Sequence, residues 1–308
     1  MTKVVTVCSF LLASLLLVNG CNGQESSSSS SIVQSSPSSI INVDLGPIFD
    51  ELPEKSEAPL QPGTSSLRMT FDVKDGIPYQ NDIVYPYFDP QDSIYIDLSG
   101  TWYKKRIENF DVNKKASLDL TFLGRSKEVV RKFVSESQGY LRGDFDKEQS
   151  DTIELPLPEN KLYGKPTRDG VEKYEMGTWY YKEININELT NSSYILKSLG
   201  SNYVTDLFVN GYYVGYHEGG HTPFAFDISS FLKEGVNSLS LRVHGIPFGM
   251  RSDTIPGDIQ GTDYFNYTGP MQLMYIEKLP LAHIARVDAL SKDTLDGFDV
   301  SVVIENKS

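Results

Sequence analysis

Alternation of apolar and polar side chains is the main structural signal in this chain of 308 residues. It is clearest in the runs 94–98, 118–122 and 239–243, where every second residue is apolar. A period of two puts the apolar residues on one face of a strand, so each run predicts a strand with one buried face. Turns rich in Gly, Pro and Asn separate these runs, and 126–136 is a brief helical candidate. The pattern predicts an all-β protein with an antiparallel jelly-roll β-sandwich over residues 67–280.

A second set of apolar positions begins after Pro280. Two further strands are predicted from these positions, which are Ile284 and Val287 followed by the alternating Val300, Val302 and Ile304. Two strands alone are marginally stable at best. Residues 281–308 are therefore predicted to be an incomplete second β-domain.

The N-terminus carries an export pattern. Lys3 precedes the apolar run 4–18, which resembles a secretory signal and is too short for a comfortable membrane span. Gly20 directly before Cys21 resembles a bacterial lipobox, which implies removal of residues 1–20 and lipidation of Cys21. Ordinary cleavage near Gly23 is the alternative. The favoured prediction is an exported lipoprotein in the bacterial membrane, periplasmic or at the cell surface.

Residues 21–66 are rich in Ser and Pro, with a run of six serines at 26–31. Such a segment buries too little apolar area to offset its ordering entropy. The segment is predicted to be a tether, flexible over 24–39 and either linker or irregular wrapping from there to residue 66.

The net charge of −13 excludes some partners. An acidic chain is repelled by nucleic acid phosphates and by anionic lipid surfaces, so contact with a membrane is expected only through the lipid anchor. Nothing in the sequence predicts an oligomeric state.

Two segments carry the candidate chemistry. In the first, 206–227, Asn210-Gly211 lies between strand formers and predicts a type I′ hairpin turn. A glycine-rich stretch and the extended run Pro-Phe-Ala-Phe-Asp follow it. The second segment, 262–269, reads Thr-Asp-Tyr-Phe-Asn-Tyr-Thr-Gly.

In this order the segments resemble the galactose-binding-like sugar-binding domain of glycoside hydrolase family two, the family of β-galactosidases and β-glucuronidases. The resemblance implies a carbohydrate partner, with Asp263 contacting hydroxyls of a terminal sugar. A carboxylate can accept two hydroxyl donors in charge-assisted bonds. Asn266 and Tyr267 match the same motif and either bind the sugar or shape the loop. The resemblance also implies that 281–308 begins an immunoglobulin-like domain.

The catalytic part of such an enzyme has no counterpart in the sequence. A TIM barrel takes about 250 residues, and retaining glycosidases need two carboxylates about 5 Å apart. We therefore assign no catalytic residue, cofactor or metal. The residues between His217 and His221 include two glycines that disfavour a helical metal site. Trp102 and Trp179 are predicted to be core residues.

Three hypotheses follow. The first is the N-terminal carbohydrate-binding portion of a secreted, lipid-anchored β-glycosidase that is inactive without its barrel. The second is a stand-alone surface lipoprotein that binds glycans without catalysis. The third, a structural adhesion domain, leaves the Asp263 motif unexplained.

Overall fold

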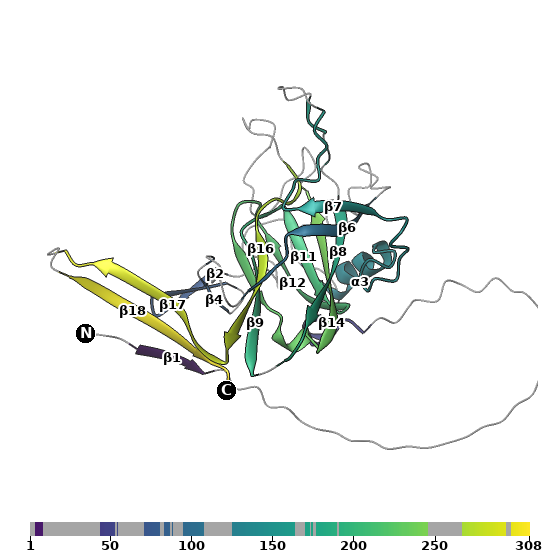
Figure 1. Cartoon of the computed structure of the whole chain (residues 1–308). Helices are drawn as coiled ribbons and strands as arrows, with labels where there is room; N and C mark the ends of the chain where they lie inside the picture. The colour runs from purple at the N-terminus through teal and green to yellow at the C-terminus, as the bar shows by residue number, and fades with distance from the viewer. Residues whose placement is uncertain are drawn as a thin grey trace, which may run out of the picture.

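A computed structural model describes the fold for residues 4–8, 44–52, 54, 71–80, 83–86, 88, 95–107, 125–163, 170–172, 174, 177–189, 191–245, 267–293 and 297–308. The predicted strand at 118–122, Cys21, Asp263 and Asn266 lie outside these residues. The described part is a β-sandwich with the helix α3 (Lys127–Glu136) on one side (Figure 1). A hairpin of β17 (Ala282–Ser291) and β18 (Phe298–Asn306) extends away from it.

One layer of the sandwich is a six-stranded sheet in the described residues. In sheet order its strands are β12 (Tyr212–Glu218), β11 (Val204–Val209), β14 (Gly235–His244), β8 (Gly177–Ile186), β6 (Gly100–Arg106) and β7 (Asp151–Leu155). The second layer has four described strands, in the order β13 (Phe224–Asp227), β9 (Ser192–Ser198), β16 (Met274–Pro280) and β5 (Tyr95–Asp97). Every pairing in these two sheets is antiparallel. The prediction of an antiparallel β-sandwich is confirmed.

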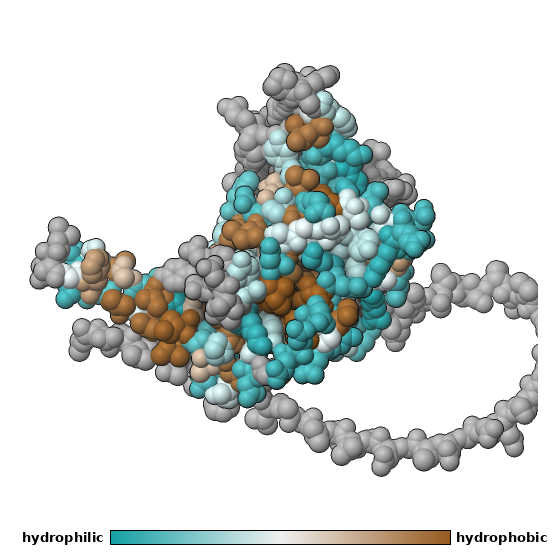
Figure 2. Space-filling view, in the orientation of Figure 1, coloured by the Kyte–Doolittle hydropathy of each residue, from teal (hydrophilic) through white to brown (hydrophobic). Residues whose placement is uncertain are grey.

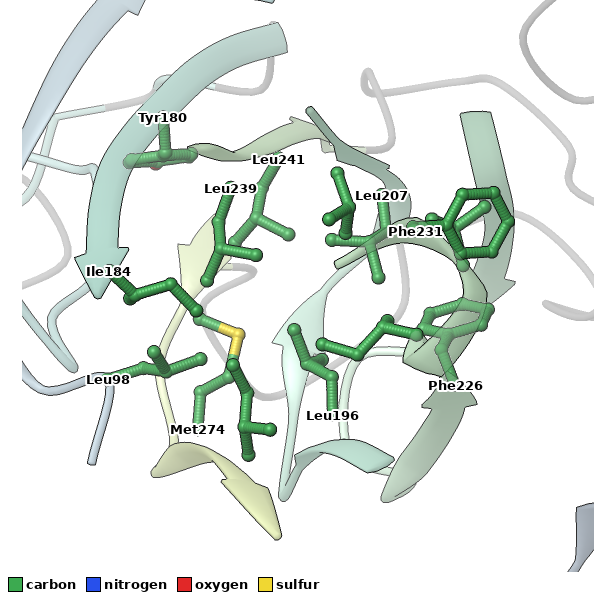
Figure 3. Packing of buried hydrophobic residues seen from close by; sticks show 14 of the residues in the cluster. Leu98, Tyr180, Ile184, Leu196, Leu207, Phe226, Phe231, Leu239, Leu241 and Met274 are labelled. Carbon is green, nitrogen blue, oxygen red and sulfur yellow. The ribbon is translucent and has the colours of Figure 1, made fainter. Parts of the chain in front are cut away.

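The main core lies between the two sheets (Figure 3). Leu239 and Leu241 of the six-stranded sheet face Leu196 and Met274 of the other sheet. Trp102 also belongs to this core and is fully buried. Burial of apolar surface stabilises a fold by about 25 cal/mol for each Å² removed from water. This layer is therefore the principal stabilising contact.

The Asn210-Gly211 turn has the predicted geometry. Both residues have positive φ, 53° for Asn210 and 81° for Gly211, as a type I′ turn requires. The side chain of Asn210 also donates to the Phe231 carbonyl and accepts from the Ser238 amide. The turn is therefore tied to neighbouring segments as well as closed by its own backbone.

The prediction of one buried face for 239–243 is wrong. Ser240 and Arg242, on the face opposite to Leu239 and Leu241, are also buried, at 0% and 1% exposure. The reason is that α3 and the segment after it cover the outer face of the six-stranded sheet. Val130 and Phe133 of α3 belong to the apolar cluster on this face, whose sheet residues are Trp179, Tyr181, Phe208 and Tyr213.

A buried ion pair holds this cover in place. Arg125, directly before α3, donates to both carboxylate oxygens of Asp206 at 2.5 and 2.8 Å, and both residues are at most 2% exposed. Tyr213 donates a third hydrogen bond to Asp206, and Arg242 donates to Glu136 at the end of α3. Both guanidinium groups also lie over the ring of Phe133, with Arg242 3.8 Å and Arg125 5.1 Å from the ring centre.

The predicted tether is packed over part of its length. Residues 44–52 contain the short helix α1 (Pro47–Glu51), and Leu45 and Leu52 are each 3% exposed. Both join the outer apolar cluster, and the Leu45 carbonyl accepts from the Tyr213 amide. Of the two alternatives for this segment, linker or irregular wrapping, the structure shows wrapping, because two leucines reach the covered face.

The two strands expected after Pro280 form the β17–β18 hairpin. β1 (Val4–Cys8) lies parallel to β18. A separate three-stranded meander consists of β2 (Phe71–Lys74), β3 (Ile77–Gln80) and β4 (Ile83–Val84). Its residues pack against Val303 of the hairpin rather than inside the sandwich. The assignment of the hairpin to an immunoglobulin-like domain stays a prediction.

We expect Asp206→Asn to lower the free energy of unfolding by about 3–5 kcal/mol, because it leaves the buried charge of Arg125 uncompensated. Urea unfolding of both proteins measures this difference. The matched control is Asp151→Asn at an exposed position of β7, where a change within about 0.5 kcal/mol is expected. Equal effects of the two substitutions would contradict a stabilising role of the Arg125–Asp206 pair.

Candidate functional site

Tyr267 is the predicted site residue that the structure describes. It is half-buried at one end of the sandwich, and its carbonyl accepts a hydrogen bond from the Asn202 side chain. The next residues run into β15 (Gly269–Pro270), which pairs with β10 (Ser201–Asn202). The C-terminal end of the 262–269 motif is therefore held by two kinds of contact with Asn202.

The glycine-rich part of the first motif meets the second motif here. A Cβ atom on Gly220 would lie 2.3 Å from the Asn202 side-chain oxygen, a distance that real Cβ atoms do not show. The Gly219 amide donates to the carbonyl of Tyr203. Asn202 thus contacts both motifs, although they are far apart in the sequence. Glycine is needed at 220 because the backbone passes so close to Asn202.

Asn160 holds the second motif from the other side. Its side-chain oxygen accepts from the backbone amide of Thr268 at 2.7 Å, and its side-chain nitrogen donates to the carbonyls of Glu172 and Tyr174. The amide of the preceding Glu159 donates to the Thr268 carbonyl at 2.7 Å. Both backbone groups of Thr268 are therefore bound by the segment 159–160.

The side chain of Glu159 belongs to a charged network. This side chain, which is fully buried, accepts from Lys104 at 2.7 Å and from Arg106 at 2.6 Å. Arg106 also donates two bonds of 2.8 Å to Glu172 and stacks over the Tyr174 ring. Hydrogen bonds from Arg106 lower the pKa of Glu172 to about 2, against the opposing effect of burial. Both carboxylates are paired with cationic side chains. The network is therefore suited to holding the end of the 262–269 motif in place rather than to transferring a proton.

Sequence reasoning did not single out this network. The members it missed are Lys104, Arg106, Glu159, Asn160 and Glu172. Each would be read as an ordinary solvated residue, because its partner is distant in the sequence. The one local signal is the Pro-Leu-Pro stretch directly before Glu159, which predicts a break in the strand and no more.

His217 has a structural role at this end of the sandwich. The ring stacks on Phe224 at 4.3 Å, and Nε2 lies 3.1 Å from the Gly219 carbonyl, an acceptor, which favours a proton on Nε2. Burial lowers the pKa of His217 to about 4, so the ring is neutral at pH 7. The residues that the structure describes hold no group of three or more metal-ligating side chains. Trp179, like Trp102, is fully buried in the core, as predicted.

Comparison with known proteins identifies the domain. Residues 143–280 match the family model described as "Glycosyl hydrolases family 2, sugar binding domain". The chain carries the sugar-binding domain of this family. This finding confirms the resemblance drawn from the two motifs, and both motifs fall inside the matched residues.

Relatives and solved structures agree with the family 2 domain. A protein of Formosa agariphila that carries the name β-glucuronidase is 30% identical over 193 residues, 62% of this chain. A β-galactosidase of Thermoanaerobacter pseudethanolicus is 27% identical over 147 residues, 47% of this chain. The structure of a β-glucuronidase from an uncultured Clostridium species shares the fold with a TM-score of 0.52 and 18% identity, covering 73% of this chain and 36% of its own.

The family 2 domain is a small part of these relatives. The chain spans about a fifth of the two curated relatives, 21% of the first and 19% of the second. In the described part of the chain, no helix is both long and apolar enough to span a membrane.

The neutral, buried state of His217 predicts a pH-dependent stability. Between pH 6.5 and pH 4 the unfolded chain binds a proton at this ring and the folded domain does not, so stability falls as the pH is lowered. We expect the parent to lose about 2 kcal/mol more than His217→Gln between pH 7 and pH 5. Urea unfolding at both pH values measures the loss. The exposed His221→Gln is the control and should lose as much as the parent.

Proposed function

We propose that this chain is the N-terminal carbohydrate-binding portion of a secreted, lipid-anchored β-glycosidase of the β-galactosidase or β-glucuronidase type. One observation carries the proposal: the two segments that define the family 2 motif meet at Asn202, at one end of a matching sandwich. Segments that are distant in sequence and converge at one end of a sandwich form a single loop surface, where binding sites are common.

We assign Asp263 of the second motif to binding the sugar. A carboxylate accepts two hydroxyl donors, and charge-assisted hydrogen bonds are about twice as strong as neutral ones. Tyr267, four residues later, is fixed by Asn202, and Thr268 is fixed by Glu159 and Asn160. A rigid end of the motif supports recognition because less conformational entropy is lost on binding. We propose Asn266 and Tyr267 as further sugar-binding residues, with shaping of the loop as their alternative role.

Catalysis is assigned to a part of the protein beyond these residues. The length of the curated relatives supports this, as does the exposed face of the β17–β18 hairpin (Figure 2). Cross-strand pairs Ile284–Ile304, Val287–Val302 and Ala289–Val300 line this face. Near the tip, Phe298 is 67% exposed. An apolar sheet face of this kind fits a further β-layer, as an immunoglobulin-like domain would supply.

The alternative is a stand-alone surface lipoprotein that binds glycans without catalysis. Its support is that apolar side chains from both sheets fill the core between them. Under either function we propose that Cys21 carries a lipid and anchors the exported protein. Cys21→Ser is then expected to move the protein from the membrane fraction to the soluble fraction of the producing bacterium. Unchanged fractionation would exclude the anchor.

The glycosidase proposal is tested on the complete reading frame that contains these residues. We expect it to encode a further β-domain and a barrel, and the product to cleave aryl β-galactosides or β-glucuronides. Asp263→Asn should lower kcat/KM at least about a hundredfold, because two charge-assisted bonds to the sugar are weakened. Asp151→Asn, exposed on β7, is the control and should leave kcat/KM unchanged.

The outcomes separate the claims. An active enzyme in which Asp263→Asn behaves like the control would refute the role of Asp263 and leave the glycosidase in place. A reading frame that ends without a barrel would refute the glycosidase. Glycan binding by the chain itself would then be the function to measure.

A further inference from the structure

The meander of β2, β3 and β4 lies between the sandwich and the β17–β18 hairpin (Figure 1). It pairs with neither of the two large sheets and instead contacts both bodies through side chains. The meander is therefore placed to connect the two bodies.

At the sandwich, the meander caps the edge of β13. The side-chain oxygen of Gln80 accepts from the Ala225 amide at 3.0 Å, and its nitrogen donates to the Pro223 carbonyl at 3.3 Å. β13 is the last described strand of the four-stranded sheet, and Gln80 is 1% exposed. One primary amide carries a donor and an acceptor, so Gln80 replaces part of a neighbouring strand.

Two tyrosines strengthen this junction. The hydroxyl of Tyr85, directly after β4, donates to the Pro223 carbonyl at 3.4 Å. The hydroxyl of Tyr275 on β16 donates to the carbonyl of Phe88 at 2.6 Å. The meander and the residues after it are thus attached to both β13 and β16.

At the hairpin, the meander makes an apolar contact. Val303 of β18 is 1% exposed and packs in one cluster with Ile77, Tyr79 and Val84. Next to it, Arg286 of β17 donates to the backbone carbonyl of Tyr85 at 2.9 Å. Arg286 and Val303 are paired across the hairpin, so the meander contacts both strands at the same position along the hairpin.

In the described residues, the base of the hairpin is joined to the sandwich by the chain itself and by an ion pair. β16 leads into β17 through Leu281, whose carbonyl accepts from the Lys307 amide. Lys307 also forms a 2.6 Å ion pair with Asp227 at the end of β13. Val303 lies four residues before Lys307 along β18, roughly 14 Å from it at about 3.4 Å per residue. A hairpin attached only at its base can swing, whereas a second support along its length fixes its direction.

We propose that the meander is a strap that sets the orientation of the β17–β18 hairpin relative to the sugar-binding sandwich. The strap joins the motif strand β13 to the hairpin through Gln80 on one side and Val303 on the other. If the proposed function holds, the strap fixes how the next domain is presented to the carbohydrate site. Its test uses this chain alone and does not depend on catalysis.

The orientation is measured by the distance between two spin labels. One label is placed at Ser291→Cys near the hairpin tip and the other at Glu188→Cys on the sandwich, both exposed, with Cys8 and Cys21 changed to serine. We expect one narrow distance distribution for the parent. Val303→Asp should broaden it, because a charge cannot remain in the apolar cluster. The matched control is Val236→Asp at a position that is 57% exposed, where no broadening is expected.

Gln80→Ala tests the other junction by a milder change. Hydrogen exchange at the Ala225 amide should become faster on the order of tenfold, since its acceptor is lost, and the distance distribution should broaden. Gln149→Ala, at an exposed position, is the control. Faster exchange at Ala225 with an unchanged narrow distribution would overturn the strap. Should Val303→Asp unfold the sandwich, the Gln80 variant still decides.

Discussion

The central strands of the six-stranded sheet are buried on both faces, and most of the structure follows from covering both. One face packs on the four-stranded sheet around Leu241, and the other packs under α3 around Phe208. A sheet buried on both sides cannot leave polar groups unpaired at low cost. This explains why Asp206, Arg125 and Arg242 appear as paired charges between the sheet and α3. Because these ion pairs are buried away from water, breaking one would leave an uncompensated charge in the interior. This cost favours a single arrangement of α3 on the sheet.

The same constraint shapes the candidate site. Strands that are packed on both faces place their connecting segments at the ends of the sandwich. There the Glu159 carboxylate is buried and balanced by Lys104 and Arg106, and the adjacent Asn160 fills all its hydrogen-bonding positions around Thr268 and the 172–174 segment. Buried groups with every bond made specify one geometry. The end of the 262–269 motif is therefore fixed by residues that would not touch the sugar.

Much of the sandwich could be predicted because its signals are local. The Asn210-Gly211 turn, the alternation at 239–243 and the helical candidate at 126–136 each depend on a few consecutive residues. The predictions failed where partners are distant in sequence. Arg242 looks like a solvent-facing residue until α3 covers it, and Leu45 looks like part of a tether until it reaches the outer cluster. The spacing of apolar residues alone cannot reveal that a further element covers the other face of a strand. Polar residues on that face, paired with buried partners, give the same alternation as an exposed face.

Three parts of the two motif segments are each held by a polar side chain from an earlier part of the chain. Arg125 binds Asp206, Gln80 binds the 223–225 edge, and Asn160 binds Thr268. Two of these anchors, Arg125 and Gln80, precede residue 143, where the family match begins. The motif strands thus depend on segments outside the recognised domain for their buried hydrogen bonds. A domain cut at the family boundary would expose Asp206 and the β13 edge, so the N-terminal segments are part of the folding unit and not an appendage to it.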